Sequence, residues 1–250
     1  MEWEAKILKV KDYSDEGKIS DRIIQLSTSP GFSFEPGQFV MIGHDSVKNK
    51  ANPSQLKWGS MSIASSNQKK EMLELVVSVG EPEGITFFAA NKRKTGDTLK
   101  VRGPFGVFGI KEAYEELAFV GGGTGIAPLM SMIRSKLENE EKKPVTLFFG
   151  FKKMDKFLYK EELEGLQKKF NNFHFFYITS REKTPQGKQG HVQELFKDCQ
   201  FDLKKNIQFF LCGTPAFVTG VRESLSALGF LEKQVHFEQW SAGAEKKPDA

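Results

Sequence analysis

Hydrophobic and polar positions follow two different patterns along the chain, and the pattern changes near residue 110. Before that point, short apolar and β-branched segments, several of them alternating with polar residues, are separated by turn signals at 29–32, 35–38 and 94–97. Such segments predict β-strands. The segments are AKILKV, RIIQLST, QFVMIG, LELVVSV and TLKVRG. Their spacing predicts a small antiparallel β-barrel, with the polar stretch 44–57 as a loop.

After about residue 114 the apolar runs become nearly continuous, as expected of strands buried on both faces of a sheet. These runs are LAFV, VTLFFGF, FHFFYITS and IQFFLCG, followed by the short segment VHFEQ. Helical patterns lie between them at 126–139, about 160–170, about 191–198 and 215–228. Strands that alternate with helices predict an α/β doubly wound parallel sheet. We therefore expect two domains, at 1–110 and 111–240, and a flexible tail at 241–250.

The amino-acid composition is that of a globular protein and indicates which residues form its core. Of the 250 residues, 39% are apolar and 27% are charged, which is enough to form a hydrophobic core. The 23 phenylalanines, against 4 tyrosines and 3 tryptophans, predict strands with an aromatic core. The net charge of +4 is compatible with an acidic protein partner or an anionic ligand. It is too small and too mixed in sign to favour nucleic acid.

Cysteine usage and the N-terminal segment limit the class of protein further. Two cysteines cannot supply a disulfide scaffold, a four-ligand zinc site or an iron–sulfur cluster on this chain. Cysteines and histidines show no metal-ligand spacing, so we expect no metal site. The N-terminal segment lacks the apolar core of a signal peptide, and no segment approaches the length of a membrane span. We therefore expect a cytoplasmic protein.

The most informative segment is GGGTGIAP at 121–128, which lies between a predicted strand and a predicted helix. Glycines allow the backbone to approach a ligand closely, and the first turn of a helix offers N–H groups to an anion. Pro128 suits that turn, because an N–H there has no helical partner to lose. The segment predicts a phosphate site, although a tight turn without a ligand would have the same composition.

Five other segments accompany GGGTGIAP in the order of a known family. They are PGQFV at 36–40, SMSIASS at 60–66, RGPFGVF at 102–108, LCGTPAFV at 211–218 and HFEQW at 236–240. Together the six segments resemble the ferredoxin–NADP reductase superfamily, and the resemblance covers residues 1 to 240. It implies FAD on the barrel and NADP or NAD on the second domain. The family's separate ferredoxin domain has no counterpart in this sequence.

The resemblance also implies individual nucleotide-binding residues. The predicted NAD(P)-binding residues are Gly123, Thr124, Gly125, Ser180, Arg181, Cys212, Gly213 and Thr214. Thr124 and Cys212 match positions near the nicotinamide, although a buried cysteine can also be purely structural. Ser180 and Arg181 match a pair that binds the 2′-phosphate of NADP, because a guanidinium suits a phosphate. They favour NADPH over NADH, unless Arg181 is only an exposed loop residue.

The flavin side is implied in the same way, with two departures from the family. The predicted FAD-binding residues are Met61, Ser62, Val77, Val79, Gly84, Ile85, Thr86 and Trp240. Gly59 stands where the family has an arginine that pairs with the flavin diphosphate, and Met61 stands where it has a tyrosine. Flavin binding is therefore weaker, differently anchored or lost.

Three residues match positions close to the reacting rings, and we take them as candidate catalytic residues. Ser62 matches a serine near the reactive flavin nitrogen, Cys212 lies near the nicotinamide, and Glu238 matches an acidic residue at the flavin edge. A solvent-facing strand serine and an edge-strand carboxylate in water are the alternatives for Ser62 and Glu238.

The function that the resemblance implies is an NAD(P)H-dependent flavoprotein reductase. It would transfer hydride to FAD and electrons to a small, acidic redox protein such as ferredoxin or flavodoxin. Two alternatives remain open from the sequence. One is a reductase that uses flavin as a loosely held substrate, and the other is a degenerate nucleotide-binding subunit with a regulatory or electron-transfer role.

Overall fold

A computed structural model describes residues 1–199 and 201–239 of the chain. The described residues form two compact units. The first unit contains Met1–Gly109 and the helical segment Met130–Ser135, and the second contains Ile110–Leu129 and residues 136–239. Among these residues, no helix combines the length and the hydrophobicity that crossing a membrane requires.

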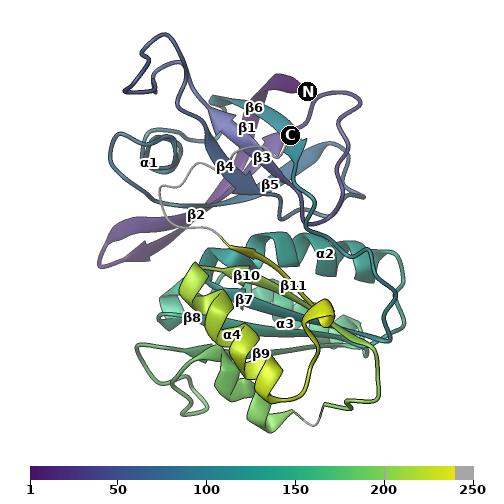
Figure 1. Cartoon of the computed structure of the whole chain (residues 1–250). Helices are drawn as coiled ribbons and strands as arrows, with labels where there is room; N and C mark the ends of the chain where they lie inside the picture. The colour runs from purple at the N-terminus through teal and green to yellow at the C-terminus, as the bar shows by residue number, and fades with distance from the viewer. Residues whose placement is uncertain (200, 240–250) are drawn as a thin grey trace. The chain divides into compact units, whose positions relative to one another are not determined.

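The first unit is a nearly closed antiparallel barrel with six strands in the order β4-β3-β6-β1-β2-β5 (Figure 1). The strands are β1 (Glu2–Asp15), β2 (Lys18–Ser27), β3 (Phe39–Gly43), β4 (Gly59–Ser62), β5 (Met72–Ser78) and β6 (Thr98–Phe105). A single bridge between Ile63 and Leu75 connects the two outer strands. The short helix α1 (Ile85–Asn91) follows β5. The predicted antiparallel barrel is confirmed.

The barrel core follows from the alternation of apolar and polar residues in the strands. Apolar side chains at every second position point inward, so that each strand contributes to one cluster. Its fully buried members include Ala5, Ile7, Ile24, Leu26, Val40, Ile42, Leu73, Leu75, Val77 and Val101. Ile85 and Ala89 of α1 belong to the same cluster. Burial of one face therefore fixes α1 against the barrel.

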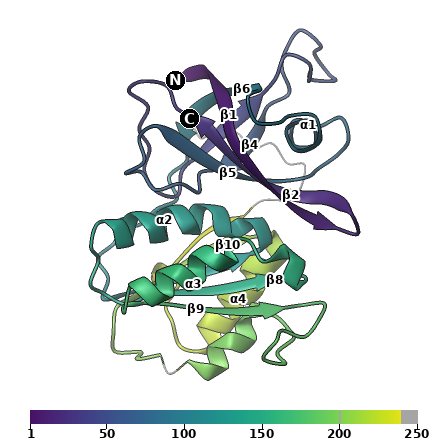
Figure 2. The ribbon, with the colours of Figure 1, turned by 180° about the vertical axis from the view of Figure 1, so that it is seen from behind.

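The second unit is a five-stranded sheet in the order β11-β10-β7-β8-β9, and every neighbouring pair is parallel. The strands are β7 (Glu116–Gly122), β8 (Val145–Phe151), β9 (Phe173–Thr179), β10 (Ile207–Gly213) and β11 (Val235–Gln239). The helices are α2 (Ile126–Glu138), α3 (Lys160–Lys169) and α4 (Pro215–Ala227). Figures 1 and 2 show α3 and α4 on opposite faces of the sheet. The predicted doubly wound sheet is confirmed.

Phenylalanine fills the core of this sheet. Phe119, Phe148, Phe149, Phe209 and Phe210 are fully buried in the strands. The rings touch one another, as between Phe119 and Phe210, whose centroids are 5.7 Å apart. The aromatic core predicted from composition is therefore present. The segment Val192–Asp198, expected as a helix, is a 3₁₀ helix, and its apolar residues pack into the cluster beneath α4.

Candidate functional site

The glycine turn after β7 has a separate physical reason for each of its later glycines. A Cβ atom placed on Gly125 would lie 2.2 Å from the carbonyl oxygen of Cys212, so β10 approaches the turn too closely for any side chain. A Cβ atom on Gly122 would lie 2.9 Å from the ring of Phe217. Gly123 differs, because it has a φ of +53° and, apart from its two chain neighbours, no described residue has an atom within 4 Å of a Cβ placed there. Among these glycines, Gly123 leaves room for a ligand.

The sheet brings two of the predicted residues, Cys212 and Glu238, to one level at the carboxyl ends of its strands. Cys212 on β10 is paired in register with Gly121 on β7 and with Glu238 on β11. The Cys212 side chain is fully buried, whereas Glu238 is half-buried. Ligands of open α/β sheets bind outside the carboxyl ends of the strands. The predicted residues Thr124, Cys212, Gly213 and Glu238 therefore meet at the edge where a nucleotide is expected.

Phe217 was not among the predicted site residues, although it covers the same edge. It lies in the first turn of α4, and its backbone N–H donates to the hydroxyl of the cap Thr214 at 3.4 Å. Its ring also leaves no room for a side chain at Gly213, where an added Cβ would lie 2.6 Å from the ring. The only signal in the sequence is the position of Phe217 three residues after Thr214. Thr214 itself caps α4, which gives this predicted residue a structural role.

Ser180 and Arg181 follow β9, at some distance from the glycine turn. Their backbone N–H groups donate to the carbonyl oxygens of Phe151 and Lys152, at 2.9 and 3.0 Å. Both side chains are exposed. Only β8 separates β9 from β7, so the two turns are two strand spacings, roughly 10 Å, apart. This separation suits the adenosine end of a dinucleotide whose diphosphate lies near Gly123.

In the first unit, β4 and α1 approach one another without an intervening side chain. A Cβ atom on Gly59 would lie 2.6 Å from Cγ2 of Ile85 and 3.5 Å from Cε of Met61. Met61 and Ile85 both pack against the barrel core. The space beside Gly59, where the family arginine would begin, is therefore filled by apolar atoms.

The remaining predicted flavin residues have mixed surroundings. The hydroxyl of Thr86 accepts from the Gly80 N–H at 3.2 Å, and the N–H of Gly84 donates to the carbonyl oxygen of Glu81 at 2.8 Å. Val77 is buried in the core, and the N–H of Val79 donates to the carbonyl oxygen of Ser20. Ser62 pairs with Phe39 on the neighbouring strand β3. Trp240 lies outside the described residues.

His236 is a titratable residue on the same strand as the predicted residue Glu238. His236, two residues before Glu238, stacks on Phe210 with ring centroids 4.8 Å apart and hydrogen bonds to Gln208 at 2.7 Å. Burial lowers the pKa of His236. Within the described residues, no cluster of His, Cys, Asp and Glu could hold a metal ion.

Comparison with known proteins identifies the second unit independently. Residues 119–223 match the family model of the oxidoreductase NAD-binding domain. The chain is 24% identical over 248 residues to the phenol hydroxylase P5 protein of Acinetobacter pittii, covering 98% of this chain and 67% of that protein. It is 30% identical over 151 residues to the xylene/toluene monooxygenase electron transfer component of Pseudomonas putida, covering 59% of this chain and 43% of that component. The chain thus spans less than half of this second relative.

Solved structures share the whole two-domain fold. A ferredoxin–NADP⁺ reductase from Neisseria gonorrhoeae, solved with bound FAD and NADP, has a TM-score of 0.79 at 20% identity and covers 95% of this chain and 98% of its own. The FAD/NAD-binding domain of a nitric oxide dioxygenase from Vibrio cholerae has a TM-score of 0.81 at 17% identity, with coverages of 95% and 98%. Residues 119–223 thus match an oxidoreductase NAD-binding domain, and the whole chain shares the two-domain fold of these FAD- and NAD(P)-binding structures.

Proposed function

We propose that the chain is an NAD(P)H-dependent flavoprotein reductase that takes hydride from NADPH or NADH and delivers electrons to a small redox protein. The observation that carries this proposal is the carboxyl edge of the parallel sheet. There the open glycine Gly123 lies one strand away from Cys212, and Glu238 follows on the next strand. The match of residues 119–223 to an oxidoreductase NAD-binding domain supports the same placement.

The residues at this edge have distinct parts in binding the nicotinamide nucleotide. Gly123 leaves space for the diphosphate, and Thr124, which carries a hydroxyl, follows it in the same turn. Gly125 lets β10 approach the turn, which keeps Cys212 close to it. Arg181 offers its charge to the 2′-phosphate of NADP. We therefore propose NADPH as the preferred donor.

The flavin site is proposed on the barrel, beside β4. A bound FAD would supply the chemistry for accepting one hydride, which carries two electrons, and for releasing these electrons one at a time. Ser62 would donate a hydrogen bond to the flavin, Met61 would cover its ring with a polarisable side chain, and the backbone of Val77 and Val79 would border it. The barrel fold, shared with a structure that binds FAD, supports this assignment.

One observation favours a second candidate function, a reductase that uses flavin as a loosely held substrate. Residue 59 is a glycine where the family has the arginine that pairs with the flavin diphosphate, and Ile85 and Met61 fill the space beside it. Flavin affinity would then be low enough for exchange during turnover.

The electron acceptor is proposed from the relatives and from charge. Relatives of the chain include electron transfer components of a xylene/toluene monooxygenase and of a toluate 1,2-dioxygenase. We propose a small redox protein such as ferredoxin or flavodoxin as the acceptor. The net charge of +4 favours an acidic one, because opposite charge accelerates association.

The proposal is tested by an absorbance spectrum of purified protein, followed by anaerobic addition of NADPH. Flavin bands that bleach on addition of NADPH are the expected result. A colourless protein that oxidises NADPH only when free flavin is supplied would support the second candidate. A protein that neither binds flavin nor oxidises NADPH in its presence would refute both.

A further inference from the structure

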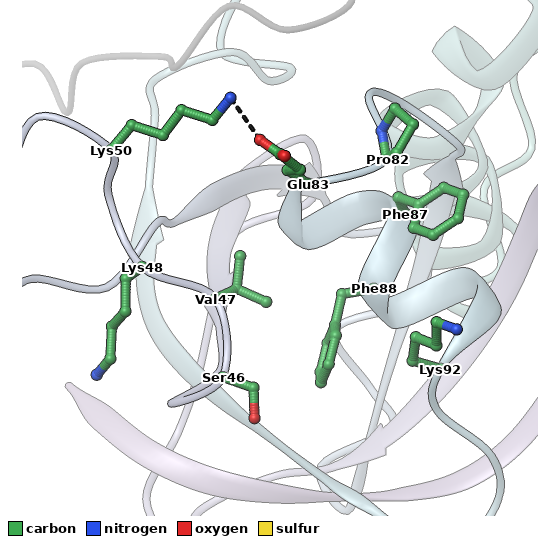
Figure 3. A pocket seen from close by; sticks show the side chains of 10 residues that line it. Ser46, Val47, Lys48, Lys50, Pro82, Glu83, Phe87, Phe88 and Lys92 are labelled. Atoms are coloured by element: carbon green, nitrogen blue, oxygen red, sulfur yellow. Dashed lines mark ion pairs between the residues drawn. The ribbon is translucent and has the colours of Figure 1, made fainter. Parts of the chain in front are cut away.

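Arg181 and Glu182 are adjacent in the chain and opposite in charge, yet they do not form an ion pair. Charged side chains elsewhere do pair, as Lys50 does with Glu83 in the first unit (Figure 3). Among residues 1–199 and 201–239, no ion pair includes Arg181 or Glu182. The contacts of Glu182 lie elsewhere, and they determine how the chain on either side of Arg181 is held.

The backbone of Glu182 closes a turn directly after β9, which we call the 179–182 turn. The hydroxyl of Thr179 is buried with the rest of its residue and donates to the backbone carbonyl oxygen of Glu182 at 2.5 Å. Between these two residues, the N–H of Arg181 donates to the carbonyl oxygen of Lys152 at 3.0 Å, while the Arg181 side chain is exposed. The turn therefore presents Arg181 to solvent from a backbone that is fixed at both of its ends.

The side chain of Glu182 ties the same turn to the segment that follows β8. Its carboxylate accepts from the backbone N–H of Met154 at 2.5 Å. Met154 begins the short 3₁₀ helix Met154–Lys156, and the first N–H groups of a helix have no partner within it. Glu182 is half-buried, so this bond is partly shielded from water. Carbonyl and carboxylate together hold the residue that follows Arg181 at two points.

The direction of the Glu182 carboxylate also decides what the Arg181 guanidinium can bind. A carboxylate paired with this guanidinium would occupy its donors and compete with a phosphate for them. Because the carboxylate is held by the Met154 N–H, the planar set of donors on Arg181 stays available to a ligand. The same hydrogen bond thus fixes the turn and keeps the positive charge at its surface uncompensated.

We infer that Glu182 is a positioning residue that sets the preference for NADP over NAD, by holding the 179–182 turn so that Arg181 meets the 2′-phosphate. This inference rests on the proposed function, in which Arg181 binds that phosphate, and it adds the residue on which the contact depends. Glu182 acts through Arg181 and makes no contact of its own with the nucleotide. Its effect is therefore confined to a nucleotide that carries the 2′-phosphate.

Equilibrium binding of NADP⁺ and NAD⁺ to the full chain, measured by calorimetry, tests the inference. Glu182→Ala removes the acceptor of the Met154 N–H, so the Kd for NADP⁺ should rise about tenfold, the usual effect of losing a hydrogen bond to a charged group. The Kd for NAD⁺ should change by less than about twofold. Glu182→Gln keeps an acceptor oxygen at the same position and should restore the affinity for NADP⁺ to within about threefold of the wild type.

A double variant separates positioning from a general structural role. A residue that acts through Arg181 has no further effect on NADP⁺ once Arg181 is absent, so the two changes should not be additive. In the Arg181→Ala protein, adding Glu182→Ala should change the Kd for NADP⁺ by less than about twofold. A merely structural role of Glu182 would instead weaken both nucleotides and add its full effect in the double variant.

The matched control is Glu115→Ala. Glu115 also accepts a backbone N–H, that of Asn206 at 2.7 Å, but it precedes β7 at the amino ends of the strands. Its removal should leave the affinities for both nucleotides unchanged.

Three results would overturn the inference. They are equal losses of NADP⁺ and NAD⁺ affinity in Glu182→Ala, additive losses in the double variant, and tighter NADP⁺ binding by Glu182→Gln, which would make the carboxylate a repulsive charge. NADP⁺ binding that depends on Arg181 but not on Glu182 would refute this inference alone. A wild-type protein that binds neither nucleotide would refute the proposed function, and the inference with it.

Discussion

Ile85 of α1 lies against Gly59 of β4 so closely that its Cγ2 atom would be 2.6 Å from a Cβ placed on the glycine. Real Cβ atoms do not approach other heavy atoms at that distance, so Gly59 is required by the packing of Ile85. The absence of a side chain at Gly59 thus makes room for the side chain of Ile85, and the strand and the helix are in direct apolar contact. A change at residue 59 must be accompanied by a change at residue 85.

This relationship predicts the effect of adding a methyl group. Gly59→Ala should lower the free energy of unfolding by about 1–3 kcal/mol, the usual range for overpacking a core. Ile85→Ala in the same protein should remove the clash, so the double variant should lose less stability than the sum of the single changes. Urea unfolding of the four proteins measures this coupling. A Gly59→Ala protein as stable as the wild type would show that α1 shifts freely.

A second prediction separates two glycines of the same turn. Gly125→Ala places a Cβ 2.2 Å from the Cys212 carbonyl oxygen, so it should destabilise the second unit by several kcal/mol. Gly123→Ala places its Cβ in open space and costs only the left-handed backbone strain, about 1–2 kcal/mol. Its main effect should be a higher KM for the nucleotide. Thermal unfolding and steady-state kinetics of both variants distinguish the two roles, and the reverse pattern would contradict them.

The outline of the fold and the nucleotide turn were predictable because they depend on local patterns. Alternation in the first part of the chain and continuous apolar runs in the second depend only on neighbouring residues, as does the strand–glycine–helix order around Gly123. Long-range packing was not predictable in this way. Ile85 is far from Gly59 in sequence, and nothing near Phe217 shows that its ring would cover Gly122. The segment 192–198 has helical periodicity, but the structure has a 3₁₀ helix there, and periodicity alone does not distinguish the two kinds of helix.

Cofactor choice gives a third prediction. Arg181→Ala should raise the KM for NADPH by about 10–100-fold, because it removes a charge-assisted hydrogen bond to the 2′-phosphate. The KM for NADH, which lacks that phosphate, should change by less than about twofold. Lys168→Ala, which removes an exposed charge from α3, serves as the control. Equal effects of Arg181→Ala on both nucleotides would remove this residue from the 2′-phosphate site.

The buried ion pair of the first unit gives a fourth prediction. Arg134 donates to Glu74 at 2.8 Å and to the carbonyl oxygen of Ala64 at 2.6 Å, and Gln25 also donates to Glu74. Both charged side chains are about 90% buried. Glu74→Gln leaves the guanidinium without its counter-charge, so the free energy of unfolding should fall by about 3–5 kcal/mol.

The control for this pair is an exposed one. Glu232→Gln breaks the ion pair with Arg222, in which the carboxylate is largely exposed, and should change the free energy of unfolding by less than about 1 kcal/mol. Urea unfolding monitored by tryptophan fluorescence compares the two. A loss in Glu74→Gln no larger than that in Glu232→Gln would mean that water reaches Arg134.

The fifth prediction concerns pH. Burial lowers the pKa of His236 below its ordinary value of 6.5, so the unfolded chain binds a proton at this residue more readily than the folded one. The free energy of unfolding should therefore decrease as the pH falls through about 6.5. Below the pKa of His236 in the folded protein, this residue should cause no further decrease. The variant His236→Gln, which cannot titrate, should show a shallower decrease between pH 8 and pH 5. Urea midpoints of the two proteins across that range measure the difference. Parallel curves would mean that His236 is protonated equally well in the folded protein, with its bond to Gln208 rearranged to accommodate the charge.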